Sequence, residues 1–360
     1  MAKFSEVLTI VNGRNQKQVV CDDGKYPIYG SGGIMGYAND YICKAETVVI
    51  GRKGSINKPI FVETPFWNVD TAFGLCANSE KLNPKYLYYF CEKFDFEKLN
   101  TTVTIPSLTK SNLLNVEIPL PNLEKQKQIV ELLDKVTSLI SLRKQQLAKL
   151  DELVKVRFVE MFGDPVSNPL HWKKVKLSEL ADIKIGPFGS LLHKEDYVTG
   201  GHPLVNPSHI INGRIIVDND LTLTEGKYFE LSAYHLKKND VVLGRRGEMG
   251  RCAVVDEEGL LCGTGSLLIR TNGTVTADYI QKIISFPTFK KTIEDMAVGQ
   301  TMPNLNVPIV SNFMIIVPPL SVQKDYYDFV ECVDQQKQTV QQSLEKLELM
   351  KKALMQEYFG

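Results

Sequence analysis

Two long stretches of the chain have the pattern of helices. The stretches 123–162 and 320–359 contain no Pro and no Gly, and apolar residues recur in them at helical spacing. The recurring residues are Val136, Leu139, Leu147, Leu150 and Val154 in the first stretch, and Val333, Val340, Leu344, Leu347 and Leu354 in the second. The seven-residue steps of the second stretch are typical of a coiled-coil seam. Each stretch therefore predicts a long helix with one apolar stripe.

The segments before these stretches have a pattern of strands and turns. Runs of β-branched and aromatic residues lie at 46–51, 115–120, 240–244 and 312–317, separated by Gly, Pro and Asn. Such runs, bounded by turn residues, predict short strands. We therefore expect an α+β protein with two globular segments of mixed strand and helix content, each followed by a long helix.

The chain also contains an internal repeat. Pro106 falls on Pro303, and the same shift of 197 positions carries the sequence without a gap to its end, where Phe162 falls on Phe359. An upstream block matches at a shift of 193 positions and places Gly51 on Gly244. Two matching blocks in the same order predict a duplicated unit, with a small insertion in the loop between the blocks.

The repeat predicts how the two long helices pair. At 1.5 Å per residue, each helix would be a rod of roughly 55 to 60 Å. A helix of this length with a single apolar stripe must bury that stripe on a partner, and its own repeat copy is available. Because the copies follow equivalent globular segments, a pseudo-two-fold relation would run them antiparallel as a coiled coil.

Composition narrows the possible functions. Lys plus Arg and Asp plus Glu number 42 each, so the formal net charge is zero and binding through bulk positive charge is excluded. A hydrophobic content of 43% with 23% charged residues is that of an ordinary globular protein of two or three domains. The N-terminus lacks the order of a signal peptide, and no window approaches the roughly 18 apolar residues of a membrane span. We expect a cytoplasmic protein without membrane contact.

Cysteine and histidine give no sign of a metal site or a disulfide framework. The seven cysteines never occur as C-x-x-C, and they are best explained as reduced thiols used as small apolar residues. His202 and His209 have neither helical spacing nor neighbouring Cys ligands. We therefore expect no metal and no cofactor.

Signatures of catalysis are also missing. The Gly-rich segment 29–37 has neither a G-K-[ST] ending nor G-x-G-x-x-G spacing before a helix, so we interpret it as a turn that allows close backbone approach. Residues 206–209, Asn-Pro-Ser-His, lack the second Pro and the aromatic residue of an adenine methyltransferase motif. No nuclease-like carboxylate pair with a Lys, no Ser-His-Asp signature and no helicase P-loop is found. The chain is predicted to be non-catalytic.

Two Gly-flanked loops are locally basic and occupy equivalent places in the repeat. Residues 51–58 carry three positive charges and no acid, and residues 244–251 carry three positive charges and one acid. One such loop is more often a solvated hairpin, but recurrence favours a shared function. Arg can bind both major-groove acceptors of guanine, and Lys suits a phosphate. The loops 102–108 and 299–305 add neutral hydrogen-bonding groups, and a Pro-containing turn before a strand explains them equally well.

At this point the sequence resembles the specificity subunit of type I restriction-modification systems, over nearly the whole chain. The resemblance is carried by residues 26–33, 48–55 and 68–72 in the first half, and by 171–177, 186–190 and 299–305 in the second. Both halves then enter a helix through Pro-Leu and Gln-Lys and leave it at Phe-Gly. No single motif is decisive, but their order, present twice, is distinctive.

The resemblance implies an architecture and a set of partners. It implies target-recognition domains at 1–120 and 166–317, joined by conserved helices at 121–165 and 318–360 that form the antiparallel coiled coil. Each domain would read one half of a bipartite, asymmetric target in double-stranded DNA. The coiled coil would dock methyltransferase subunits that modify adenine, and restriction subunits that translocate and cleave would join through that core.

DNA contact is expected from the basic loops and their neighbours. The candidates are Arg52, Lys53, Lys58, Arg245, Arg246 and Arg251, with Tyr29, Ser31, Asn57, Gln300 and Asn304 as further ones. Two alternatives stay open. One is a scaffold whose coiled coil gathers partner subunits while its domains never touch DNA. The other is a self-sufficient modification enzyme, which would need the missing cofactor and catalytic motifs.

Overall fold

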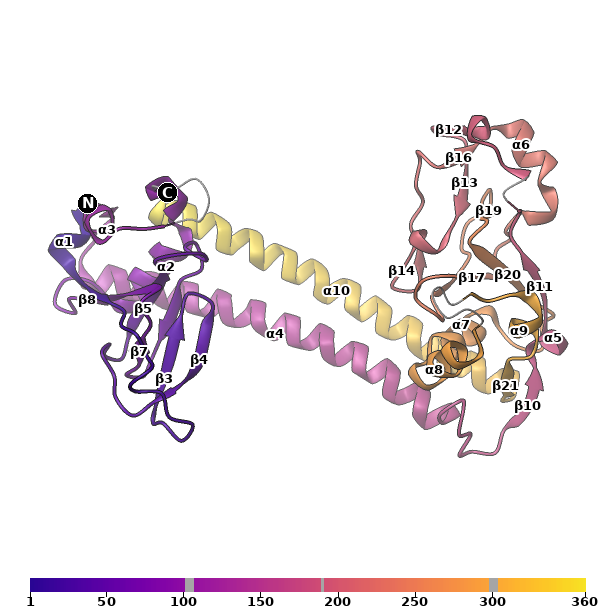
Figure 1. Ribbon diagram of the computed structural model, residues 1–360, viewed down its shortest axis with the longest axis horizontal. Coiled ribbons are helices and arrows are strands. Elements are labelled where there is room, and N and C mark those ends of the chain that lie inside the picture. Colours follow the sequence, from indigo (N-terminus) through magenta and orange to yellow (C-terminus); the bar gives the residue numbers. More distant parts are fainter. Residues whose placement is uncertain (101–106, 189–190, 298–303) are drawn as a thin grey trace. The chain divides into compact units, whose positions relative to one another are not determined.

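The computed structural model describes residues 1–100, 107–188, 191–297 and 304–360, which form two units (Figure 1). Unit 1 comprises Met1–Ala148 and Lys337–Gly360, and unit 2 comprises Lys149–Gln336. Each unit contains one globular part and a portion of each of the two long helices, α4 (Leu123–Phe162) and α10 (Leu320–Phe359).

Unit 1 is built on a four-stranded antiparallel sheet. Its elements before α4 are β1 (Ala2–Lys3), α1 (Phe4–Val7), β2 (Leu8–Asn12), β3 (Tyr26–Gly30), β4 (Gly33–Ala38), β5 (Thr47–Gly51), β6 (Ile60–Val62), β7 (Trp67–Asn68), β8 (Ala72–Ala77), α2 (Pro84–Lys93), a 3-10 helix (Phe96–Leu99), α3 (Lys110–Leu114) and β9 (Glu117–Ile118). The sheet has the order β2-β8-β5-β6, and β5 is buried along its whole length. A smaller sheet, β4-β3-β7, carries the Gly-rich hairpin.

Unit 2 repeats the four-stranded sheet and adds further strands. Its elements between the long helices are β10 (Lys173–Lys176), α5 (Leu177–Leu180), β11 (Ala181–Ile185), a 3-10 helix (Lys194–Asp196), β12 (Tyr197–Val198), β13 (His202–Val205), a 3-10 helix (Pro207–His209), β14 (Ile210–Ile211), β15 (Arg214–Ile215), β16 (Thr222–Leu223), α6 (Glu225–Glu230), a 3-10 helix (Ser232–Tyr234), β17 (Asp240–Gly244), β18 (Cys252–Val254), β19 (Leu261–Cys262), β20 (Ser266–Thr271), α7 (Ala277–Ser285), α8 (Pro287–Met296), α9 (Val307–Ser311) and β21 (Met314–Val317). The order β11-β20-β17-β18 is antiparallel like its counterpart in unit 1. The second sheet, β12-β16-β13-β19, makes unit 2 different from unit 1.

A buried glutamine fixes the start of each long helix. The Gln126 side chain accepts a hydrogen bond from the Asn83 amide at 2.8 Å and donates to the Pro121 carbonyl at 2.8 Å. Its repeat copy, Gln323, accepts from the Thr276 amide at 3.0 Å and donates to the Pro318 carbonyl at 2.9 Å. Both side chains are fully buried, so these bonds are needed to compensate the loss of water. This explains the Gln-Lys entrance found twice in the sequence.

Each unit joins the start of one long helix to the end of the other. In unit 1 the Phe359 ring, at the end of α10, packs on Tyr86 with centroids 4.9 Å apart, and Lys144 of α4 pairs with Glu348 at 2.9 Å. In unit 2 the Phe162 ring, at the end of α4, packs on Tyr279 at 5.1 Å. Within each unit the two helices therefore run in opposite directions, as the repeat predicted.

The two helices begin and end at the predicted residues, with one error in the apolar stripe. Val136 and Leu150 are buried on α4, but Leu139 is 45% exposed and does not belong to the stripe. The strand expected at 115–120 is limited to β9, because the Asn115 amide donates to the Asn112 and Leu113 carbonyls and closes α3. Asn312 closes α9 in the same way, so the strand expected at 312–317 begins at Met314.

Candidate nucleic-acid interface

The basic loops after β5 and β17 are held in the same backbone frame. The Arg52 carbonyl accepts from the Leu108 amide at 2.9 Å, and the Arg245 carbonyl accepts from the Leu305 amide at 2.9 Å. One residue further on, Lys53 pairs with Ser107 and Arg246 pairs with Asn304 in isolated β-bridges. In each unit, the basic loop belongs to the repeat block that matches at a shift of 193 positions, and its bonding partner belongs to the block that matches at a shift of 197 positions. The two sequence blocks therefore meet at the basic loop in both units.

A glycine brings a third loop against this frame in each unit. A Cβ atom on Gly13 would lie 1.7 Å from the Val69 carbonyl oxygen, and one on Gly186 would lie 2.0 Å from that of Gly263. Only glycine fits this approach between backbones. The residues that follow, Arg14 in unit 1 and Pro187 with Phe188 in unit 2, are thereby placed beside the loops preceding β8 and β20.

In unit 1 the three predicted cations are exposed. The side chains of Arg52, Lys53 and Lys58 face solvent, and the Arg52 guanidinium also lies 5.8 Å from the Phe73 ring centroid. Asn57 has a structural role, because its carboxamide accepts from the Phe96 amide at 2.7 Å and donates to Asp95 at 3.0 Å.

The Gly-rich hairpin touches the same loop from the other side. A Cβ on Gly51 would lie 3.0 Å from the Cβ of Ser31, so β5 ends against the turn between β3 and β4. Gly33 has a φ of 122°, a backbone conformation that favours glycine. A Cβ at this position would meet open space, so the surface beside Gly33 is accessible. Tyr29 lies edge-on to Phe66 at 5.4 Å and lines a groove of about 620 Å³ whose wall does not include the basic loop.

In unit 2 the two neighbouring arginines differ. Arg245 is half-buried: its Nε donates to the Leu305 carbonyl at 3.1 Å and its Nη1 to the Thr264 carbonyl at 3.4 Å. Burial, and the nearby charge of Arg246, lower the pKa of Arg245 from its usual value. Arg246 is exposed, and together with Arg245 and Phe188 it lines a cleft of about 270 Å³.

Phe188 was not singled out as a contact residue from the sequence. Its side chain is 62% exposed at the wall of this cleft, where an aromatic ring next to two guanidinium groups is suited to stack on a base. The signal that could have indicated it is the glycine directly after the strand, at the same place as Gly13 in unit 1.

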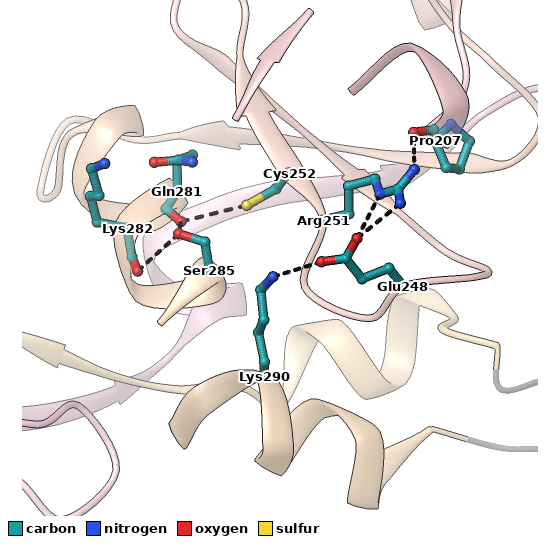
Figure 2. Close-up of polar contacts among 8 residues, drawn as sticks. All are labelled: Pro207, Glu248, Arg251, Cys252, Gln281, Lys282, Ser285 and Lys290. Carbon is teal, nitrogen blue, oxygen red and sulfur yellow. Dashed lines mark hydrogen bonds and ion pairs between the residues drawn. The ribbon is translucent and has the colours of Figure 1, made fainter. Parts of the chain in front are cut away.

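Of the three remaining candidates of unit 2, two lie within the described residues. Arg251 pairs with Glu248 at 2.9 Å and donates to the Pro207 carbonyl at 3.2 Å (Figure 2). Asn304 is half-buried, and its side-chain oxygen has no hydrogen-bond partner in the described part of the chain. Gln300 lies outside the described residues.

The described residues hold no group of His, Cys, Asp and Glu side chains suited to a metal ion. His209 instead binds the Leu204 carbonyl through Nδ1 at 2.7 Å, within the 3-10 turn that follows Asn206. None of the seven cysteines forms a disulfide. Among the same residues, every helix is too short or too polar to cross a membrane.

Comparison with known protein families matches residues 1–152 and 169–349 to the type I restriction modification DNA specificity domain. The chain belongs to this specificity family. The two matched stretches cover the sheets of both units and most of both long helices, so the family assignment accounts for nearly the whole chain, including both basic loops.

Individual members of the specificity family align over most of the chain. The type I restriction enzyme MjaVIII specificity subunit of Methanocaldococcus jannaschii is 24% identical over 332 residues, which cover 86% of this chain and 75% of that protein. A putative type I restriction enzyme specificity subunit of Haemophilus influenzae is 25% identical over 353 residues, 89% of this chain and 83% of that protein.

This chain is also similar in fold to a solved structure of a type I S subunit. The type I restriction-modification S subunit from M. genitalium superposes with a TM-score of 0.62 at 17% identity, covering 100% of this chain and 95% of that one. The fold, with mixed α/β domains and long helices, is therefore similar to that of this solved S subunit.

Proposed function

We infer that the chain is the DNA specificity subunit of a type I restriction-modification complex and is not itself catalytic. The observation that carries this proposal is the basic loop frame, built twice from equivalent backbone bonds on two units of different sequence. Two similar but unequal surfaces suit the reading of two unequal half-sites.

The exposed cations supply the chemistry of contact. Arg52 and Arg246 project from the ends of rigid, buried strands, where a guanidinium can bind guanine O6 and N7 in the major groove. Lys53 and Lys58 suit phosphates, which set the position of the protein on the duplex. Arg245 has a different role, because its carbonyl bonds already hold the loop together.

The proposed organisation follows the repeat. Recognition domains at 1–120 and 166–317 would each read one half of a bipartite, asymmetric duplex target, and the helical segments 121–165 and 318–360 would join them and assemble with methyltransferase and restriction subunits. One solved structure similar to this chain, with a TM-score of 0.63, is described as concerning complex assembly of the type I R-M system. We propose a cytoplasmic location, where such a complex meets DNA.

The proposal is tested by reconstituting the chain with its methyltransferase subunit and mapping methylated adenines across a random-sequence library. Methylation confined to one sequence of two blocks, separated by a fixed number of unread base pairs, is expected. Stable assembly with random or absent methylation would instead support the scaffold alternative and contradict the proposal.

A further inference from the structure

A cavity in unit 2 collects more positive than negative charge. It has a volume of about 390 Å³ and lies between the turn joining β14 to β15, the loop before β18, and helices α7 and α8. Its charged lining consists of Arg251, Lys282, Lys290 and a single acid, Glu248. Arg251 and Lys290 both face this one carboxylate, so an anion that replaced it would meet two cations.

The single acid occupies two of these cations at once. One Glu248 oxygen accepts from Arg251 Nη2 at 2.9 Å, and the other accepts from Lys290 Nζ at 3.0 Å. Figure 2 shows the two cations reaching the carboxylate from different elements, Lys290 from α8 and Arg251 from the loop before β18. A bidentate oxyanion held between a guanidinium and an ammonium has the geometry of a bound phosphate.

The carboxylate is held in this place only loosely. The Glu248 side chain is 54% exposed, and the side chains of Arg251 and Lys290 are 35% and 31% exposed. Hydrogen bonds from Arg251 and Lys290 lower the pKa of Glu248, so the carboxylate is ionised at neutral pH. Ion pairs with this much exposure are weak, and rotation of one side chain would release both cations.

The first repeat lacks this acid. At the shift of 193 positions, Ser55 stands where unit 2 has Glu248, and Lys58 stands where unit 2 has Arg251. The residues that follow, Ile56 and Met249, are buried at 1% and 3% exposure, so this position of the loop packs into the core in both units. At this position of the basic loop, unit 2 therefore has an acid and unit 1 has none.

We propose that this cavity binds a phosphodiester group of the DNA backbone, and that Glu248 occupies the place of that group in the DNA-free subunit. The proposal rests on the DNA-binding function inferred above. A duplex would have to displace the carboxylate to gain the phosphate contact. This cost is the same for a cognate and a random duplex, so Glu248 would lower the affinity for DNA without changing the preference between sequences.

The test compares complexes of the full chain with its methyltransferase subunit, carrying either Glu248→Gln or Glu230→Gln. Glu230 is a matched control, because it is 60% exposed in unit 2 and pairs with Lys227 at 3.1 Å, outside the cavity. Affinity for random-sequence and target duplexes is measured by fluorescence anisotropy over a range of salt concentrations. Glu248→Gln should tighten binding to random DNA about three- to tenfold, with a similar gain on the target and a steeper salt dependence.

Three results would overturn the proposal. One is an equal gain in Glu248→Gln and Glu230→Gln, which would reflect net charge alone. Another is a gain from Glu248→Gln that stays undiminished in a Lys290→Gln background, because the acid would then not act through that cation. The third comes from melting the subunit with inorganic phosphate at constant ionic strength. A melting temperature raised by phosphate, with unchanged DNA affinities in Glu248→Gln, would assign the cavity to a free anion.

The inferred DNA function can fail separately. If the wild-type complex binds all sequences equally, the inferred function is contradicted, and this proposal with it. If the wild-type complex prefers one bipartite target while Glu248→Gln binds random DNA as wild type does, only the role of Glu248 is contradicted.

Discussion

The neighbouring arginines of unit 2 allow a structural role to be separated from DNA contact. Arg246 is exposed, and none of the described residues receives a hydrogen bond from its side chain, so Arg246→Ala should change the free energy of unfolding by no more than about 0.5 kcal/mol. Arg245 donates to two carbonyls at 3.1 and 3.4 Å from a half-buried position. Because these bonds are long, we expect Arg245→Ala to cost about 1 to 2 kcal/mol of stability.

For DNA affinity, we expect the larger loss in Arg246→Ala and the smaller loss in Arg245→Ala. Arg246→Ala should weaken binding to the target by about 1 to 3 kcal/mol if the guanidinium reads a base, or reduce the salt slope by about one if it contacts a phosphate. Arg245→Ala should weaken binding only as far as the loop loses its shape. Arg245→Lys keeps the positive charge but lacks the several N–H donors of the planar guanidinium. It should therefore recover little of the stability that Arg245→Ala loses.

The two tryptophans make the stability measurement specific. Trp67 lies in unit 1 and Trp172 in unit 2, so a Trp67→Phe background leaves one fluorescent reporter of unit 2 during urea unfolding. Target affinity is measured on the same variants in complex with the methyltransferase subunit. Equal destabilisation by Arg246→Ala and Arg245→Ala, or an Arg246→Ala complex with unchanged affinity and salt slope, would refute the assignment.

Three further outcomes are expected. Gln323→Ala leaves one part-buried and one buried backbone group without partners and should cost about 3 kcal/mol. Gln336→Ala, at an exposed position of α10 in the same unit, should cost less than about 0.5 kcal/mol in the same urea titration. Phe188→Ala should leave stability unchanged and lose about 1 kcal/mol of target affinity by anisotropy, and equal affinity would exclude stacking. Burial raises the pKa of the Cys252 thiol to about 12. At pH 8 a maleimide should therefore label the exposed Cys332 first and Cys252 only after unfolding. Labelling of both thiols at the same rate would contradict the structure.

The long helices could be predicted to the residue because their limits are local. Pro121 and Pro318 precede the two stretches, and glycine follows each final Phe, so the sequence itself marks where a helix can begin and end. The sequence predicted the two repeat blocks but not that they meet at one loop. The backbone bond from Leu108 to Arg52 and its copy from Leu305 to Arg245 show this contact.

The separate roles of Arg245 and Arg246 could not be predicted from the sequence. The strand before them is buried on both faces, so alternation of polar and apolar residues does not indicate which guanidinium turns inward. The pairing of Glu248 with Lys290 joins residues far apart in the chain through the packing of α8, and no local pattern signals it. The second sheet of unit 2 contains strands of two residues, such as β12 and β16, which are too short for a periodic pattern.

The most direct test of two separate reading surfaces is the methylation map of complexes in which one basic loop is altered at a time. Arg52→Ala and Arg246→Ala complexes are incubated with the same random-sequence library as the wild type, and base preference is measured at every position around the methylated adenines. Each variant should relax preference within one block of the target, and the two variants should affect different blocks. Relaxation of the same block by both variants, or unchanged preference in both, would contradict two separate reading surfaces.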